Sequence, residues 1–164
     1  MIDRRTALST LIPKAAAALL LGSSALFASG QRPVTVPERI TGAERVVVAK
    51  AARVQANWQQ NAYGDMLIVS EILLEVEETL KGSPDRLVWL DLEGGTLGGI
   101  TLRVSDLPEI RAGERAVFFL DRTDSANFAP HLRGQGILKL DPQNAVTGSS
   151  LRLDDIRRMA REGR

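Results

Sequence analysis

The sequence predicts an all-β fold, a small antiparallel barrel of five to six strands, followed by a C-terminal α-helix. Three observations predict it. Segments of β-branched or alternating residues follow one another at short spacing. No helical segment of ten to fifteen residues separates them, which argues against a parallel α/β sheet. Four glycines within residues 94–99 suit the corner of a closed, bent sheet.

Composition excludes several chemistries before any motif is considered. The chain has 164 residues, no cysteine, one histidine and a formal net charge of +1. The lack of cysteine excludes a disulfide scaffold, a thiolate zinc site and a cysteine nucleophile. One histidine cannot form a multi-histidine metal site within one chain, and a near-zero charge gives no electrostatic argument for nucleic acid. We therefore expect no cofactor, no metal site and no nucleic-acid partner.

Residues 1–30 have the parts of a cleaved export signal. Two arginines, Arg4 and Arg5, precede an uncharged apolar stretch over residues 15–28 that ends in small residues. We expect cleavage before Gln31 and a periplasmic or extracellular protein. As a helix the stretch spans only about 21 Å, against a hydrocarbon core of about 30 Å, so we expect no membrane anchor after cleavage. The arginine pair resembles a twin-arginine signal, and this route and general export both stay open.

The start of the mature chain is expected to be irregular. Residues 31–43 contain two prolines and a glycine and are expected to form an extended lead-in. The barrel itself is expected over residues 44–140. Its first strand is predicted at residues 44–56, where valines dominate, and a polar loop at residues 57–65.

Residues 66–80 are the most informative segment. Apolar and charged residues alternate along it, with Ile68 and Ile72 on one face and glutamates on the other. A second apolar series, which includes Val69 and Leu73, has helical spacing. We prefer a strand because β-branched residues dominate the segment. A helix at this position would refute the barrel.

Four further strands complete the expected barrel. Three of them alternate or are short, whereas an unbroken apolar run predicts a strand that is covered on both faces. The strands are predicted at residues 86–93, 100–105, 116–120 and 136–140, with a loop at residues 121–133.

Residues 141–164 are predicted to be a turn-rich linker and a terminal helix. Ser150 is expected to cap the helix, because a serine hydroxyl accepts from the free N–H groups of a first turn. Leu153, Ile156 and Ala160 then form one apolar stripe. The helix therefore has a face to bury against the barrel.

Several short motifs follow one another between residues 44 and 140. They are ANW (56–58), VEETLKG (76–82), GGTLGG (94–99), LPEIRAGERAVFFL (107–120) and GQGILKL (134–140). Their order resembles a family of exported bacterial proteins that has no established biochemical activity. More distantly, the order of LKG and GERAVFFL resembles the netrin-like module, an OB barrel shared with tissue inhibitors of metalloproteinases. Those inhibitors require an N-terminal cysteine, which this chain lacks, so the resemblance implies an OB-like barrel and not protease inhibition.

The candidate binding residues lie at one end of this barrel. Trp58 and Tyr63 are at the ends of the polar loop, where aromatic side chains can anchor a partner or cap the barrel. The glycine-rich segment can form a nest of N–H groups facing an anion or a partner strand, or a corner where any side chain would clash. The glycines are Gly94, Gly95, Gly98 and Gly99.

Other polar groups give weaker hypotheses. Asp91 and Glu93 share one strand face about 7 Å apart, a spacing that could serve acid–base chemistry on a sugar. The aromatic content of 4% provides no sugar cleft. His131 has no GxSxG serine to activate and is expected to be an ordinary loop residue. A strip of acidic residues can attract cations or form a wet strand face. The strip consists of Glu71, Glu75, Glu77 and Glu78.

The sequence as a whole predicts an exported, non-catalytic protein-binding module. Its expected partner is another envelope or extracellular protein, and its expected contact surface carries Trp58, Tyr63 and residues 94–99. One alternative is an inhibitor or accessory domain of an exported peptidase. The other is a hydrolase that uses Asp91 and Glu93.

Overall fold

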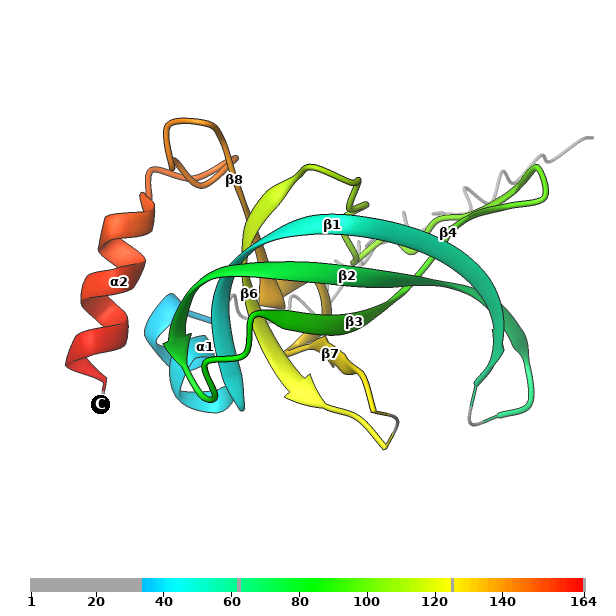
Figure 1. Ribbon diagram of the computed structural model, residues 1–164, viewed down its shortest axis with the longest axis horizontal. Coiled ribbons are helices and arrows are strands. Elements are labelled where there is room, and N and C mark those ends of the chain that lie inside the picture. Colours follow the sequence, from blue (N-terminus) through cyan, green and yellow to red (C-terminus); the bar gives the residue numbers. More distant parts are fainter. Residues whose placement is uncertain (1–33, 62, 125, 164) are drawn as a thin grey trace, which may run out of the picture. The chain divides into compact units, whose positions relative to one another are not determined.

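The computed structural model describes residues 34–61, 63–124 and 126–163 (Figure 1). The expected export segment, residues 1–30, lies outside the described residues. Within the described ranges, no helix combines the length and the apolar character needed to cross a membrane.

Six strands form one mixed sheet, and five of them close into a nearly complete ring (Figure 1). They are β1 (Arg45–Gln60), β2 (Met66–Lys81), β3 (Leu87–Glu93), β6 (Arg115–Arg122), β7 (Phe128–Pro130) and β8 (Ile137–Leu140). β1 pairs with β2 on one edge and with β6 on the other, and β8 pairs with β6. β7 connects β6 to β3, to which it is joined by one parallel pair, Leu90 with Phe128. The expected OB-like barrel is confirmed, with this parallel contact as its one departure from an antiparallel sheet.

β1 and β2 form a long, bent hairpin of two 16-residue strands. Three register shifts between residues 46 and 53 mark β-bulges, which bend a strand and increase its twist. The alternation predicted for residues 66–80 is confirmed, because Ile68, Ile72 and Leu74 are buried. The helical alternative for this segment is therefore wrong.

The polar loop expected at residues 57–65 is strand over its first four residues. β1 continues to Gln60, which pairs with Met66, so the connection shortens to residues 61–65. Residues 57–60 pair with β2 only, and their side chains lie outside both hydrophobic clusters, so polar residues are tolerated there. Asn57 donates from Nδ2 to Glu71 of β2 at 2.9 Å, which adds a polar cross-strand contact.

Two hydrophobic clusters lie on the two faces of β6. Phe118 and Leu120 contribute to the cluster inside the barrel, and Val117 and Phe119 contribute to the cluster under the helices. All four are fully buried. The prediction that residues 116–120 form a strand covered on both faces is confirmed, and the two cores explain why the run has no alternation.

The extended lead-in expected at residues 31–43 is wrong for its second half. Helix α1 (Val36–Gly42) forms there, with Pro37 in its first turn. Thr35 Oγ1 accepts the N–H of Glu38, and the Glu38 carboxylate accepts the N–H of Thr35 at 2.8 Å. This capping box and the proline, which favours the first helical turn, offset the low helix propensity of the segment.

The terminal helix α2 (Leu153–Glu162) is confirmed, and its expected stripe of Leu153, Ile156 and Ala160 is buried. Ser150 does not cap it. The helix begins after Arg152, whose N–H donates to the carboxylate of Asp155 at 3.0 Å.

The strand expected at residues 100–105 forms over its first three residues only, and it does not belong to the barrel. β4 (Gly95–Leu97) and β5 (Ile100–Leu102) form a separate two-stranded hairpin that leaves the barrel. Ile100 on this hairpin is 57% exposed. The loop expected at residues 121–133 also contains β7, and the 3₁₀ turn Arg133–Gly136 follows it.

Candidate functional site

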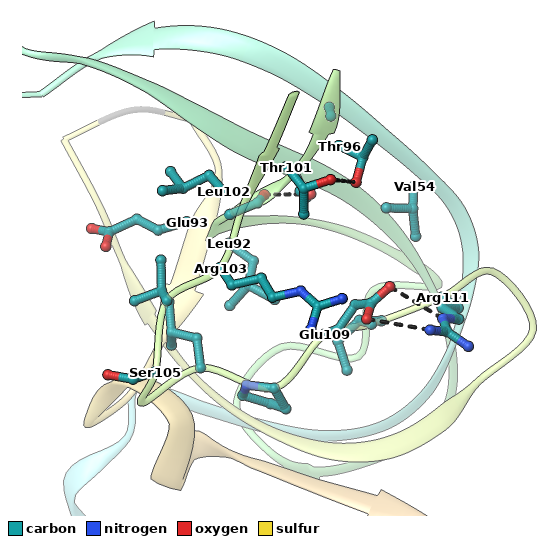
Figure 2. Close-up of a pocket in the computed structure, with 18 of the residues that line it drawn as sticks. Val54, Leu92, Glu93, Thr96, Thr101, Leu102, Arg103, Ser105, Glu109 and Arg111 are labelled. Carbon is teal, nitrogen blue, oxygen red and sulfur yellow. Dashed lines mark hydrogen bonds and ion pairs between the residues drawn. The ribbon is translucent and has the colours of Figure 1, made fainter. Parts of the chain in front are cut away.

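A pocket of about 720 Å³ opens between the far half of β1 (residues 53–60), the β4–β5 hairpin and residues 103–112 (Figure 2). Much of its lining is apolar, with Val54 and Ala56 from β1 and Leu92 from the end of β3. The segment 103–112 forms the opposite wall and adds Leu107. A partly apolar concavity with a few polar groups is the usual form of a binding site.

Gly94 and Gly95 allow the chain to pass close over β1 and β2. Both have positive φ, +103° and +139°. Gly94 N–H donates to Ile68 O at 2.7 Å, and Gly94 O accepts the hydroxyl of Ser70 at 2.7 Å. A Cβ on Gly95 would lie 2.6 Å from that hydroxyl oxygen. This pair therefore forms the corner where a side chain would clash, and the Gly94 N–H is engaged within the chain.

Gly98 and Gly99 lie at the tip of the β4–β5 hairpin. Their φ angles of +59° and +82° suit a two-residue hairpin turn, which places both central residues in the left-handed region. No described atom outside the adjacent residues lies within 4 Å of a Cβ built on either glycine. The four glycines thus have two separate roles, a packed corner and an open turn.

Trp58 and Tyr63 have different surroundings, although the sequence grouped them at one loop. Trp58 lies on β1 opposite Ile68, on the same strand face as Val54 and Ala56, and is 48% exposed. It therefore continues the pocket-lining face of β1 toward the hairpin tip. Tyr63 is 91% exposed at that tip, so its ring caps nothing among the described residues.

Exposed hydrophobic side chains gather on these two hairpins. Among the described residues, six large hydrophobic side chains are exposed, and four of them belong to the β1–β2 and β4–β5 hairpins. Both hairpins lie toward the same side of the sheet, at the right of Figure 1. The four are Trp58, Tyr63, Met66 and Ile100.

Arg103 lines the pocket and is a candidate residue that the sequence does not single out. Figure 2 shows its side chain reaching from the end of the hairpin toward Glu109. Glu109 is already paired with Arg111 at 3.2 Å, and the guanidinium of Arg111, helped by Arg103, lowers the pKa of Glu109. Arg103 itself makes no hydrogen bond or close ion pair within the described ranges. The alternating residues around Arg103 predict only a solvent-exposed strand face, so the sequence contains no signal that distinguishes Arg103 from other exposed arginines.

Arg133 holds the far wall of the pocket in place. Its guanidinium donates to Asp106 in segment 103–112 and, at 3.0 Å, to Glu93 at the end of β3. These hydrogen bonds raise the pKa of Arg133 and lower that of Asp106. The wall is therefore tied to the barrel by two ion pairs that share one cation.

The residues considered for catalysis each have a separate structural partner. Asp91 accepts a hydrogen bond from Asn127 at 2.8 Å, whereas Glu93 is paired with Arg133. His131 Nδ1 lies 2.7 Å from Asp121 Oδ2, and its Nε2 packs against Gly42 at the end of α1. These contacts fasten loops and α1 to the barrel.

The acidic strip divides into separate contacts. Glu77 pairs with Arg115 and Glu78 with Arg157, both at 2.7 Å. Glu71 accepts from Asn57. Glu75 stays exposed on β2. No set of three or more metal-ligating side chains occurs in the part of the chain that the structure describes.

In comparisons with known proteins, no family model and no curated protein matches the chain. The surface itself offers a contact area, with exposed aromatic and aliphatic side chains on the hairpins and a pocket whose lining includes the guanidinium of Arg103. Such an arrangement can bind a partner through apolar anchors and charge complementarity.

Proposed function

We propose that this chain is an exported, non-catalytic protein-binding module. Its contact surface is the hairpin end, defined as residues 53–61, 63–68 and 94–112. The observation that carries the proposal is the concentration of exposed hydrophobic side chains on the two hairpins. Large exposed apolar groups beside a concavity are typical of an interaction surface.

The arrangement of the barrel supports a division between support and contact. Side chains of the core are buried on both faces of β6, and α1 and α2 supply one of these two layers. The hairpin end adds Ile110, Val54 and Leu107 to the inner cluster, and its exposed side chains lie outside both clusters. Its exposed residues are therefore free to contact another protein, which we propose to be an envelope or extracellular one.

A pull-down from envelope extract tests the proposal, with residues 31–164 as bait. The test variant is Trp58→Ala/Tyr63→Ala. The matched control is Leu87→Ala/Leu132→Ala, which also removes two exposed hydrophobic side chains, 57% and 43% exposed, away from the hairpin end. We expect the test variant to lose a prey that wild type and control both retain. Equal capture by all three baits, or no prey at all, would contradict the proposal.

Export is tested separately by cell fractionation and N-terminal sequencing. We expect the full-length chain to be processed to a form that begins at Gln31 and is found outside the cytoplasm. Retention of an unprocessed chain in the cytoplasm would overturn the export proposal and leave the binding proposal intact.

A further inference from the structure

β1 has a free edge along its far half. It pairs with β2 over residues 46–60, but with β6 only over residues 45–50. Ala51 still exchanges backbone hydrogen bonds with Gly113 and Glu114 at 2.8 and 2.9 Å. Beyond this point, no described strand or isolated bridge pairs with the second edge of residues 53–60. Unpaired strand edges of this kind are templates for an added strand.

The pocket lies beside this free edge. Val54 and Ala56 belong to the edge segment and line the pocket, whose opposite wall is residues 103–112. Side chains of an added strand would point alternately to the two faces of the sheet. Those on the face of Val54 and Ala56 would enter the pocket, so the edge can supply backbone pairing and the pocket can select side chains.

The unpaired charge of the pocket determines the kind of side chain that fits. Glu93 is ion-paired with Arg133, which it shares with Asp106, and Glu109 is ion-paired with Arg111. Arg103 lines the pocket and makes no hydrogen bond or ion pair within 4 Å among the described residues, and its charge reaches Glu109 only at longer range. A carboxylate on the bound segment would complement it with a charge-assisted hydrogen bond.

We propose that the partner binds as an extended acidic segment that adds as a strand to the second edge of β1 at residues 53–60. Apolar side chains at alternate positions occupy the pocket, and an aspartate or glutamate pairs with Arg103. This inference rests on the proposed protein-binding function and specifies its partner class.

A library of random ten-residue peptides, selected on the immobilised mature chain, tests the inference. We expect enriched peptides to have apolar residues at every second position and one acidic residue. The best synthetic peptide should slow amide hydrogen exchange in residues 53–60. The same peptide with alternate backbone amides methylated should bind at least about tenfold more weakly, because strand pairing requires those N–H groups.

The charge is tested with Arg103→Gln. We expect this variant to bind the peptide about tenfold more weakly. The control Arg86→Gln removes an exposed arginine in the β2–β3 turn, away from the pocket, and should leave affinity unchanged. Urea unfolding of both variants verifies that they are folded.

Three outcomes would overturn strand addition. They are failure to enrich any peptide, enrichment of peptides that leave exchange in residues 53–60 unchanged, and a concentration-dependent dimer that protects this edge without peptide. If the pull-down still depends on Trp58 and Tyr63, protein binding stands and only the mode of binding is wrong. If both experiments fail, the proposed function fails with the inference.

Discussion

The two halves of β1 belong to one continuous strand but have different environments. In residues 45–51, one edge pairs with β2, and the other edge pairs with β6 and with the turn at residues 113–114. Every side chain of this half except that of Lys50 is buried. In residues 53–60 only β2 is paired, and no side chain is fully buried. The difference lies in what the second edge contacts. It shows that one strand can stabilise the barrel with its first half and present a contact surface with its second.

The amino-acid sequence of the strand follows this division. The first half reads RVVVAKA and the second reads RVQANWQQ. β-branched residues suit a strand buried on both faces, whereas glutamine and asparagine suit a strand with one face in water. We therefore expect substitutions of residues that pack against the first half to lower the free energy of unfolding much more than substitutions in the second half.

The largest expected effect comes from Phe118→Ala. Phe118 is opposite Val47 and has no exposed surface, so its removal leaves a cavity inside the barrel. We expect a loss of about 3–5 kcal/mol in the free energy of unfolding, measured with urea. Trp58→Ala in the second half should cost less than about 1 kcal/mol. Comparable losses for the two variants would refute the division.

A second prediction compares the two glycine pairs. Gly95→Ala forces a Cβ to within 2.6 Å of Ser70 Oγ at a φ of +139°, and we expect a loss of about 2–3 kcal/mol. Gly99→Ala meets no neighbouring atom and should cost only about 1 kcal/mol for its left-handed backbone. Urea unfolding of both variants measures the difference. A larger loss at Gly99 would show that the turn, and not the corner, holds this end together.

A third prediction concerns the charge at the start of the buried half. The Arg45 side chain is 4% exposed and donates to Asp85 at 2.7 Å. Asp85→Ala leaves this cation buried without its carboxylate, and we expect a loss of about 1–2 kcal/mol, since Asp85 itself is 60% exposed. Asp85→Asn keeps one acceptor and should cost less. If Asp85→Ala unfolds at the same temperature as wild type, the carboxylate contributes nothing to stability.

Most of the fold could be predicted from local patterns. Period-2 alternation identified β2 and β3, and the unbroken run identified β6. The sequence predicts an extended segment at residues 31–43, and not helix α1, because prolines usually interrupt a helix. Thr35 and Glu38, however, have the spacing of a capping box, which is visible in the sequence. The sequence predicts a loop at residues 57–60, the last four of β1, because their strand pairing depends on β2, a contact that composition does not encode.

The site was less predictable than the fold. The sequence predicts Trp58 and the glycines as binding residues. Of these, Gly95 of β4 lies next to Ala56, which is on the pocket-lining face of β1. Arg103 could not be identified, because its significance depends on which neighbouring carboxylates are already paired. The free edge of β1 was also invisible, since it depends on where β6 stops pairing.

The smallest expected effect is a pH dependence at the pocket wall. The guanidinium of Arg133 holds the pKa of Asp106 below its ordinary value of 3.8. A carboxyl group with a lower pKa in the folded state stabilises the fold fully above its unfolded pKa. That contribution is lost as the pH falls through the folded pKa. Acid should therefore weaken the tie between residues 103–112 and the barrel.

The comparison of wild type with Arg133→Gln tests this tie, because the variant removes the cation that Asp106 and Glu93 share. At about pH 6 the variant should unfold at a lower temperature than wild type, and the gap should narrow steadily toward about pH 2 as Asp106 becomes protonated. Arg158→Gln, which removes an exposed ion pair on α2, is the matched control for a lost arginine. If the gap for Arg133→Gln does not change with pH, the wall is held by packing and not by charge. The free edge of β1 would then face a wall whose position acid does not alter.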